Sequence, residues 1–154
     1  MPDPLVDTWL INARIDLYLL AGLQEAALTA TASSGGRTVG EMLAHIHNVR
    51  LMWLKASAPD LLSGLEKIER TPAPSAAGLA KALDASASAV ATLVGRALET
   101  GGKVKGFKPH VHGFVGYLIS HESHHRGQVL LTLKLAGQPV DKKITYGLWE
   151  WGSR

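Results

Sequence analysis

Apolar residues recur along this chain at the three- and four-residue spacing of helices in four long segments. We predict helices over residues 4–30, 38–57, 76–99 and 110–136. No segment of useful length alternates between apolar and polar residues as a strand would. The pattern therefore predicts an all-α protein, a four-helix bundle formed as a single domain over residues 1–154. The connection over residues 58–75 is long enough to cross the bundle, so a simple up-down-up-down order is not required.

Capping residues mark the ends of these predicted helices. Asp3 stands before Pro4, which is an N-cap followed by proline at the first helical position. Thr38 and Glu41 have the spacing of a capping box. Gly137 follows the fourth helix at the position where a left-handed residue ends many helices. Further boundary signals are Pro59, Ser75, Gly101, Gly102 and Pro139.

The last segment, DKKITYGLWEWGSR, is too aromatic to stay free in solution. Its apolar side chains are Tyr146, Leu148, Trp149 and Trp151. We expect this tail to pack back on the bundle.

Histidines form the most unusual feature of the fourth predicted helix. His121 and His125 are four residues apart, and both point toward the apolar face of that helix. His124 lies on the flank. Two inward imidazoles are costly to bury without partners, and a divalent metal satisfies both and holds them neutral. The alternative is that each ring only donates a hydrogen bond to a carbonyl or a carboxylate.

A complete metal site needs a third ligand from another helix. The second predicted helix offers His45 and His47. His45 lies at the edge of the apolar face and is the better candidate, whereas His47 points away, so we expect it at the surface or in an interface. His110 and His112, at the start of the fourth helix, should be exposed and could flank the mouth of a site.

Two segments together resemble a known family. They are LAHIHNVRLMWL, residues 43–54, and HESHHRGQVLLTLKLAGQPV, residues 121–140. Their order, the H-x-x-x-H-R-G-Q string and the Gly-x-Pro stop are similar to the DinB-like, or YfiT-like, superfamily of metal-dependent proteins. The resemblance covers nearly the whole chain, and the helix-two histidine is its weaker part.

The resemblance implies a four-helix bundle with metal ligands His45, His121 and His125. Zinc or nickel is the expected metal, and dimers are common. Some relatives are thiol S-transferases that use low-molecular-weight thiols, others resemble isomerases or hydrolases, and many have no assigned reaction. We therefore expect either an enzyme that activates a thiol or a water for transfer to, or hydrolysis of, a small-molecule substrate, or a non-catalytic metal-binding stress-response protein.

Four residues near these ligands are candidates for supporting roles. Gln128 faces inward and could hydrogen-bond a ligand imidazole or a metal-bound water. Arg126 is expected to pair with an acid of a neighbouring helix. Glu122, predicted on the rim of the inner face, and His124 are the candidate acid or base groups. The string His121-Glu122-Ser123-His124-His125 also matches the zincin motif, but short strings recur by chance and we discount a protease.

Composition narrows the classes of function. The chain has 154 residues, no cysteine and a net charge of +3, with a pI near 9.3. Without cysteine, disulfides and thiolate ligands are impossible. The N-terminus lacks the basic region of a signal peptide, and we find no apolar run long enough to span a bilayer, so we expect a cytoplasmic protein. Lys103, Lys105 and Lys108 form the densest basic cluster, which we interpret as a solvated loop, so nucleic-acid binding is not expected.

Overall fold

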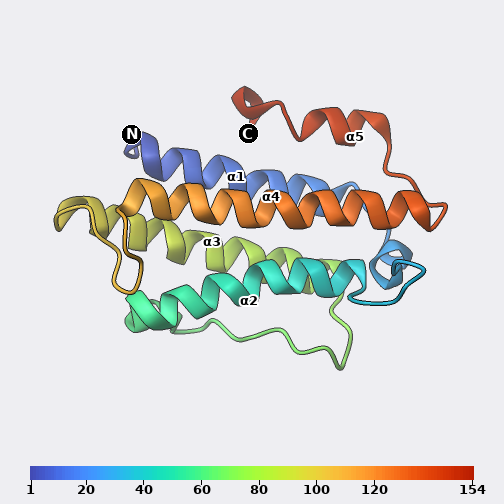
Figure 1. Ribbon diagram of the computed structural model, residues 1–154, viewed down its shortest axis with the longest axis horizontal. Helices are drawn as coiled ribbons and strands as arrows, with labels where there is room; N and C mark the ends of the chain where they lie inside the picture. The colour runs from blue at the N-terminus through green and yellow to red at the C-terminus, as the bar shows by residue number, and fades with distance from the viewer.

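The computed structural model describes all 154 residues and is all-α. Four long helices lie side by side with their axes close to parallel (Figure 1). Short helical segments follow some of them, and α5 lies along one edge of the molecule, on the side of α1 (Figure 1). The α-helices are α1 (Pro4–Ala21), α2 (Val39–Ser57), α3 (Ala76–Glu99), α4 (Val111–Leu135) and α5 (Lys142–Gly147), and the 3-10 segments are η1 (Glu25–Thr29), η2 (Pro59–Leu62) and η3 (Trp151–Ser153).

The predicted capping residues set the ends of α2, α3 and α4. The Thr38 hydroxyl accepts a hydrogen bond from the Glu41 amide at 3.1 Å, and the Ser75 hydroxyl accepts one from the Gly78 amide at 3.0 Å. Gly137 adopts a φ of 75°, the left-handed conformation that ends a helix at little cost only in glycine. The ends of these three helices match the predictions to within one residue.

The prediction for the first helix is wrong at its C-terminal end. Helix α1 ends at Ala21 rather than near residue 30, and the chain continues into η1. Gly22 terminates the helix, and its amide donates to the carbonyls of Tyr18 and Leu19. A Cβ atom at Gly22 would lie 3.0 Å from the Ile144 side chain. The distant α5 thus approaches this turn closely, a contact that the local apolar pattern does not reveal.

Helices α2 and α3 run in the same direction, opposite to α1 and α4 (Figure 1). The segment between them therefore returns along α2 before α3 begins. Two polar side chains of α2 hold it in place. His47 Nε2 donates to the Glu66 carbonyl at 2.8 Å, and Asn48 both donates to and accepts from the backbone of Ile68 at 2.9 Å.

The core consists of two apolar clusters with a polar layer between them. One cluster gathers Trp9, Val90 and Phe114 near one end of the long helices. The other gathers Leu43 and Leu133, among others, near the other end. The buried polar side chains that lie between the two clusters along the helices include Asn12, Asp16, Arg50, Ser86, Glu122 and Arg126.

Two further expectations need correction. By length and composition α3 could cross a membrane, contrary to our prediction that no such segment exists; its alanines raise its hydropathy, and it packs against α1 and α2. In the tail, Leu148 and Trp151 are partly buried as expected, and Arg154 lies 3.6 Å above the Tyr18 ring. However, Tyr146 and Trp149 are 71% and 80% exposed.

Candidate metal centre

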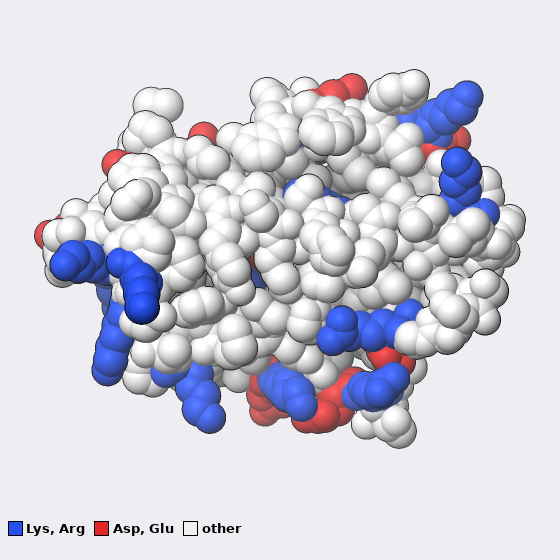
Figure 2. Space-filling view, viewed as in Figure 1, with Lys and Arg blue, Asp and Glu red and all other residues white.

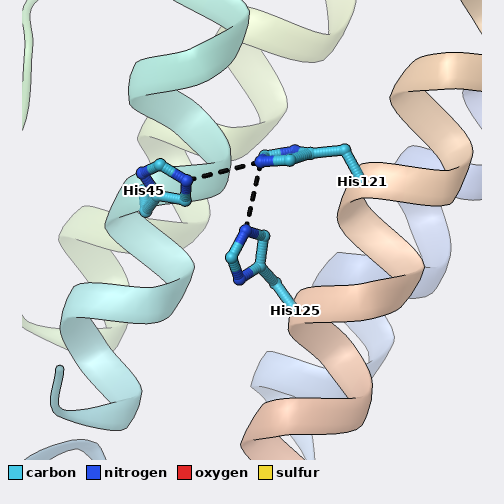
Figure 3. A group of neighbouring side chains, drawn as sticks. All are labelled: His45, His121 and His125. Carbon is cyan, nitrogen blue, oxygen red and sulfur yellow. Dashed lines mark hydrogen bonds between the residues drawn. The ribbon is translucent and has the colours of Figure 1, made fainter. Parts of the chain in front are cut away.

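Three imidazoles converge between α2 and α4. His45 projects from α2, and His121 and His125 project from successive turns of α4 (Figure 3). His121 Nε2 lies 3.3 Å from His45 Nε2 and 3.1 Å from His125 Nε2. One ring nitrogen from each residue lies within 4.8 Å of the other two. The geometry brings together the three residues that the sequence analysis selected.

These separations suit a shared ion. Ring nitrogens bind zinc at about 2.0–2.1 Å, so two ligands of a tetrahedral site lie roughly 3.3 Å apart. The two Nε2–Nε2 distances are close to that value. The residues present therefore fit a divalent transition metal.

Hydrogen bonding alone satisfies this cluster poorly. His125 Nδ1 donates to Gln128 Oε1 at 2.8 Å, which leaves a lone pair on its Nε2. The single Nε2 of His121 contacts both other rings, and one ring proton cannot form two well-aligned hydrogen bonds. His121 Nδ1 is buried and has no partner. A buried ring nitrogen in this state usually indicates a missing water or ligand, and a metal bound to Nε2 would not by itself satisfy it.

The surroundings keep the three rings neutral. Burial, followed by the charge of Arg37 and the two neighbouring imidazoles, lowers the pKa of His45 to about 4. Burial is also the largest cause that lowers the pKa of His121 and of His125. Neutral imidazole is the form that binds metals, so the cluster is ready to ligate at neutral pH.

The residues that were predicted to support the site differ in where the structure places them. Gln128 contacts a candidate ligand as expected, although it is exposed. His124 is exposed on the flank, with its ring centroid 5.1 Å from that of His125. Glu122 does not lie on a rim: it is fully buried. His110 and His112 are exposed, as predicted, and His110 caps α4 by accepting from the Gly113 amide.

Glu122 belongs to a buried charge network on the opposite flank of the same turns of α4. Arg50 is its centre, and its guanidinium makes five hydrogen-bond contacts with Glu122, Asp16, Ser86 and the Leu83 carbonyl. Asn12 Nδ2 donates to Glu122 Oε2 at 2.6 Å. The two carboxylates are thus held between side chains from α1, α2 and α4.

Arg126 completes this network from α4. Its Nη1 donates to Asp16 Oδ1 at 2.6 Å, and its Nη2 donates to Asn12 Oδ1 at 3.0 Å. The predicted pairing of Arg126 with an acid of a neighbouring helix is therefore confirmed. Asp16, on α1, accepts from Arg126 through one oxygen and from Arg50 through the other.

The charges of the network affect one another strongly. Burial opposes ionisation of Glu122, but the adjacent Arg50 outweighs it and lowers the pKa of Glu122. Burial also opposes the charge of Arg50, and Glu122 and Asp16 together raise the pKa of Arg50. Burial and the Glu122 carboxylate raise the pKa of Asp16, against the charges of Arg126 and Arg50. Two cations thus face two acids, as a buried ionic cluster requires.

The sequence analysis misplaced His47 and did not select Arg50. His47 is only 1% exposed and Arg50 is completely buried. Leu43, Leu51 and Leu54 are also buried, so the inner face of α2 is centred closer to His47 than the sequence analysis placed it. The spacing of residues 43, 47, 50 and 54 is the signal that could have identified both residues.

A cavity of about 290 Å³ lies beside the histidine cluster. Helix α2 and residues 67–70 of the returning segment line most of it, and His45 is one of the lining residues. Neither His121 nor His125 lines it, so the cavity reaches the cluster only at His45.

The fold and the site together define a class of protein: an all-α protein with a three-histidine cluster between α2 and α4. A family model described as "DinB family" matches residues 1–152, so the chain belongs to the DinB family, and the resemblance seen in its histidine-rich segments is confirmed. No curated protein and no solved structure matches this chain.

Proposed function

We propose that His45, His121 and His125 bind one divalent transition metal, zinc or nickel, within a single-domain four-helix bundle. The observation that carries this proposal is the convergence of three Nε2 atoms whose contacts cannot all be hydrogen bonds. All-imidazole donor sets suit zinc, nickel, copper and iron. The choice of zinc or nickel follows the family.

A bound metal would supply a Lewis acid that lowers the pKa of a thiol or a water. Residues of this chain would prepare the site for that chemistry. The contact of His125 Nδ1 with Gln128 fixes the tautomer that leaves Nε2 free to ligate. The neutral state of all three rings means that no proton must leave before binding at pH 7.

We propose that the protein is an enzyme, a thiol S-transferase or a hydrolase that acts on a small molecule. The cavity beside His45 supports this reading, because a ligand needs access to an open coordination position. The alternative, a non-catalytic metal-binding stress-response protein, would be favoured by a site that protein side chains close. Exposed His124 is the better candidate acid or base, since the Glu122 oxygens accept from Arg50 and Asn12.

We also propose a cytoplasmic homodimer. The absence of cysteine fits a reducing compartment. The exposed rings of Tyr146 and Trp149 would suit an interface. Light scattering on wild type and a Trp149→Ser variant tests the dimer, and a wild-type monomer at micromolar concentration would exclude it.

Elemental analysis of untagged protein tests the metal site. We expect about one metal per chain in wild type, and none in His121→Ala or His125→Ala. His45→Ala should also lose the metal, whereas His47→Ala should retain it because His47 donates to the Glu66 carbonyl instead. Equal metal content in all these variants, or no metal in reconstituted wild type, would contradict the proposal.

A further inference from the structure

The cavity beside His45 has a charged lining that the proposed metal chemistry does not use. Five of its lining residues carry charge: Arg37, Glu41, Lys67, Glu69 and Arg70. Figure 2 shows blue and red side chains mixed along the lower edge of the molecule, over α2 and the segment that follows it, while the adjacent face is largely uncharged. The charged lining of the cavity thus lies on the same side of α2 as His45.

Four of these charges already neutralise one another. Arg70 pairs with Glu41 at 2.9 Å, and Lys67 pairs with Glu69 at 3.4 Å. The lining contains three cations and two carboxylates, so one positive charge remains. The cavity therefore favours a ligand with a single negative charge over a dianion.

Arg37 is the cation without a partner. No hydrogen bond or ion pair involves its guanidinium, and its side chain is exposed just before α2 begins. Arg37 and His45 line the same cavity, so the Arg37 guanidinium faces the same space as the nearest of the three imidazoles. A planar guanidinium binds a carboxylate through two parallel hydrogen bonds.

We propose that this cavity selects small ligands that carry one carboxylate, which Arg37 binds while another group of the ligand reaches the metal. The inference rests on the proposed function, because it requires the histidine cluster to hold a metal. A cavity of about 290 Å³ is at the lower end of the range for ligand sites, which suits a molecule of a few carbons rather than a large cofactor. Arg37 is then a specificity residue, and the histidines provide the reactive centre.

Two thiols that differ mainly in charge test this assignment. Both 3-mercaptopropionate and 2-mercaptoethanol present a thiol on a two-carbon chain, but only the first carries a carboxylate. Their affinities are measured by calorimetry on zinc-loaded wild type, Arg37→Gln and the control Lys108→Gln, with metal content determined before and after each titration. Lys108 is an exposed cation in the connection between α3 and α4, near the far end of α2, and it does not line this cavity.

We expect wild type and Lys108→Gln to bind 3-mercaptopropionate about tenfold more tightly than 2-mercaptoethanol, the gain that one charge-assisted contact typically provides. In Arg37→Gln the two affinities should come within about twofold, with the affinity for 2-mercaptoethanol unchanged. Metal-loaded wild type that binds the two thiols equally, or binds neither, overturns the role of Arg37 and leaves the metal site intact. Wild type that holds no zinc overturns both.

Discussion

Two polar regions occupy neighbouring positions on α4, and they differ in how completely their groups are satisfied. His121 and Glu122 are adjacent in sequence, as are His125 and Arg126, so each turn sends one side chain to each region. None of the buried side-chain atoms in the network around Arg50 lacks a partner, whereas the histidine cluster leaves His121 Nδ1 unpaired. A closed network stabilises one packing of the helices, while an unsatisfied and partly accessible cluster is a site for a ligand.

The two regions are compared most directly by substituting residues in each of them separately. Truncation of Arg50 should lower the free energy of unfolding by about 3–5 kcal/mol, because Glu122 would remain buried without a cation and Asp16 would keep only Arg126. Urea denaturation of Arg50→Ala measures the loss. Arg96→Ala is the control: its pair with Asp60 is exposed, and its loss should stay below about 1 kcal/mol.

Should Arg50→Ala fail to fold, Glu122→Gln removes one charge with little change of volume and should still be clearly less stable than Arg96→Ala. Equal stability of the network variants and the Arg96 control would mean that the network is not a structural element.

Stability that depends on metal should come from the histidine cluster alone. Metal at about 100 times its dissociation constant should stabilise wild type by about 2.7 kcal/mol and His125→Ala not at all. Without metal, the two proteins should agree within about 1 kcal/mol, since His125 contributes little to the apolar core. Denaturation with metal and with chelator measures both quantities. Metal-free His125→Ala that is several kcal/mol less stable would indicate a structural histidine.

A smaller effect should come from the residue that orients one ligand. Gln128→Ala removes the acceptor for His125 Nδ1 and should weaken metal affinity by about 10- to 100-fold, the usual effect of losing such a partner. Competition with a chromogenic chelator measures the affinity. Gln138→Ala is the matched control, because this exposed side chain has no hydrogen bond to the cluster. Equal affinities would mean that the Gln128 contact does not position the ligand.

The smallest effect concerns pH. The pKa of His45 is about 4 in the folded protein against an ordinary value of 6.5, so the unfolded chain binds more protons over that range. The stability contributed by neutral His45 should therefore be present above about pH 6.5 and be lost as the pH falls toward 4. Urea midpoints at pH 7, 6 and 5 should fall more steeply for metal-free wild type than for His45→Gln.

Comparison with the His45 variant isolates the imidazole in this experiment. The raised pKa of Asp16 acts with the opposite sign, but it is present in both proteins and cancels. The lowered pKa of Glu122 changes stability only at pH values below about 4.5. Identical slopes for wild type and His45→Gln would show that His45 does not titrate at an unusual pH.

Local chemistry explains which parts of this molecule were predictable. Thr38, Ser75 and Gly137 act within one turn of their own helix ends, so the sequence identifies α2, α3 and α4 without knowledge of the fold. The pairing of His121 with His125 depends only on helical periodicity. Their position opposite His45 required a second helix, and there the family resemblance and the helical phase selected the same residue.

Features that depend on distant contacts were not predictable in the same way. Apolar residues continue past Gly22, whereas α1 ends there and Ile144 of α5 packs close to the turn. Asn12 and Asp16 lie within the buried stripe of α1, but their partners come from α2 and α4. A polar residue inside an apolar stripe is visible in the sequence, whereas the identity of its partner depends on how the helices are arranged.

The segment that returns along α2 has a consequence for divergence within the family. It is attached to α2 by His47 and Asn48, and between or beyond those anchors it contributes Lys67, Glu69 and Arg70 to the wall of the cavity. Substitutions there change no core residue and no candidate ligand. Substitutions in this short segment could therefore change which ligand the cavity prefers, while the helices and their histidines stay the same.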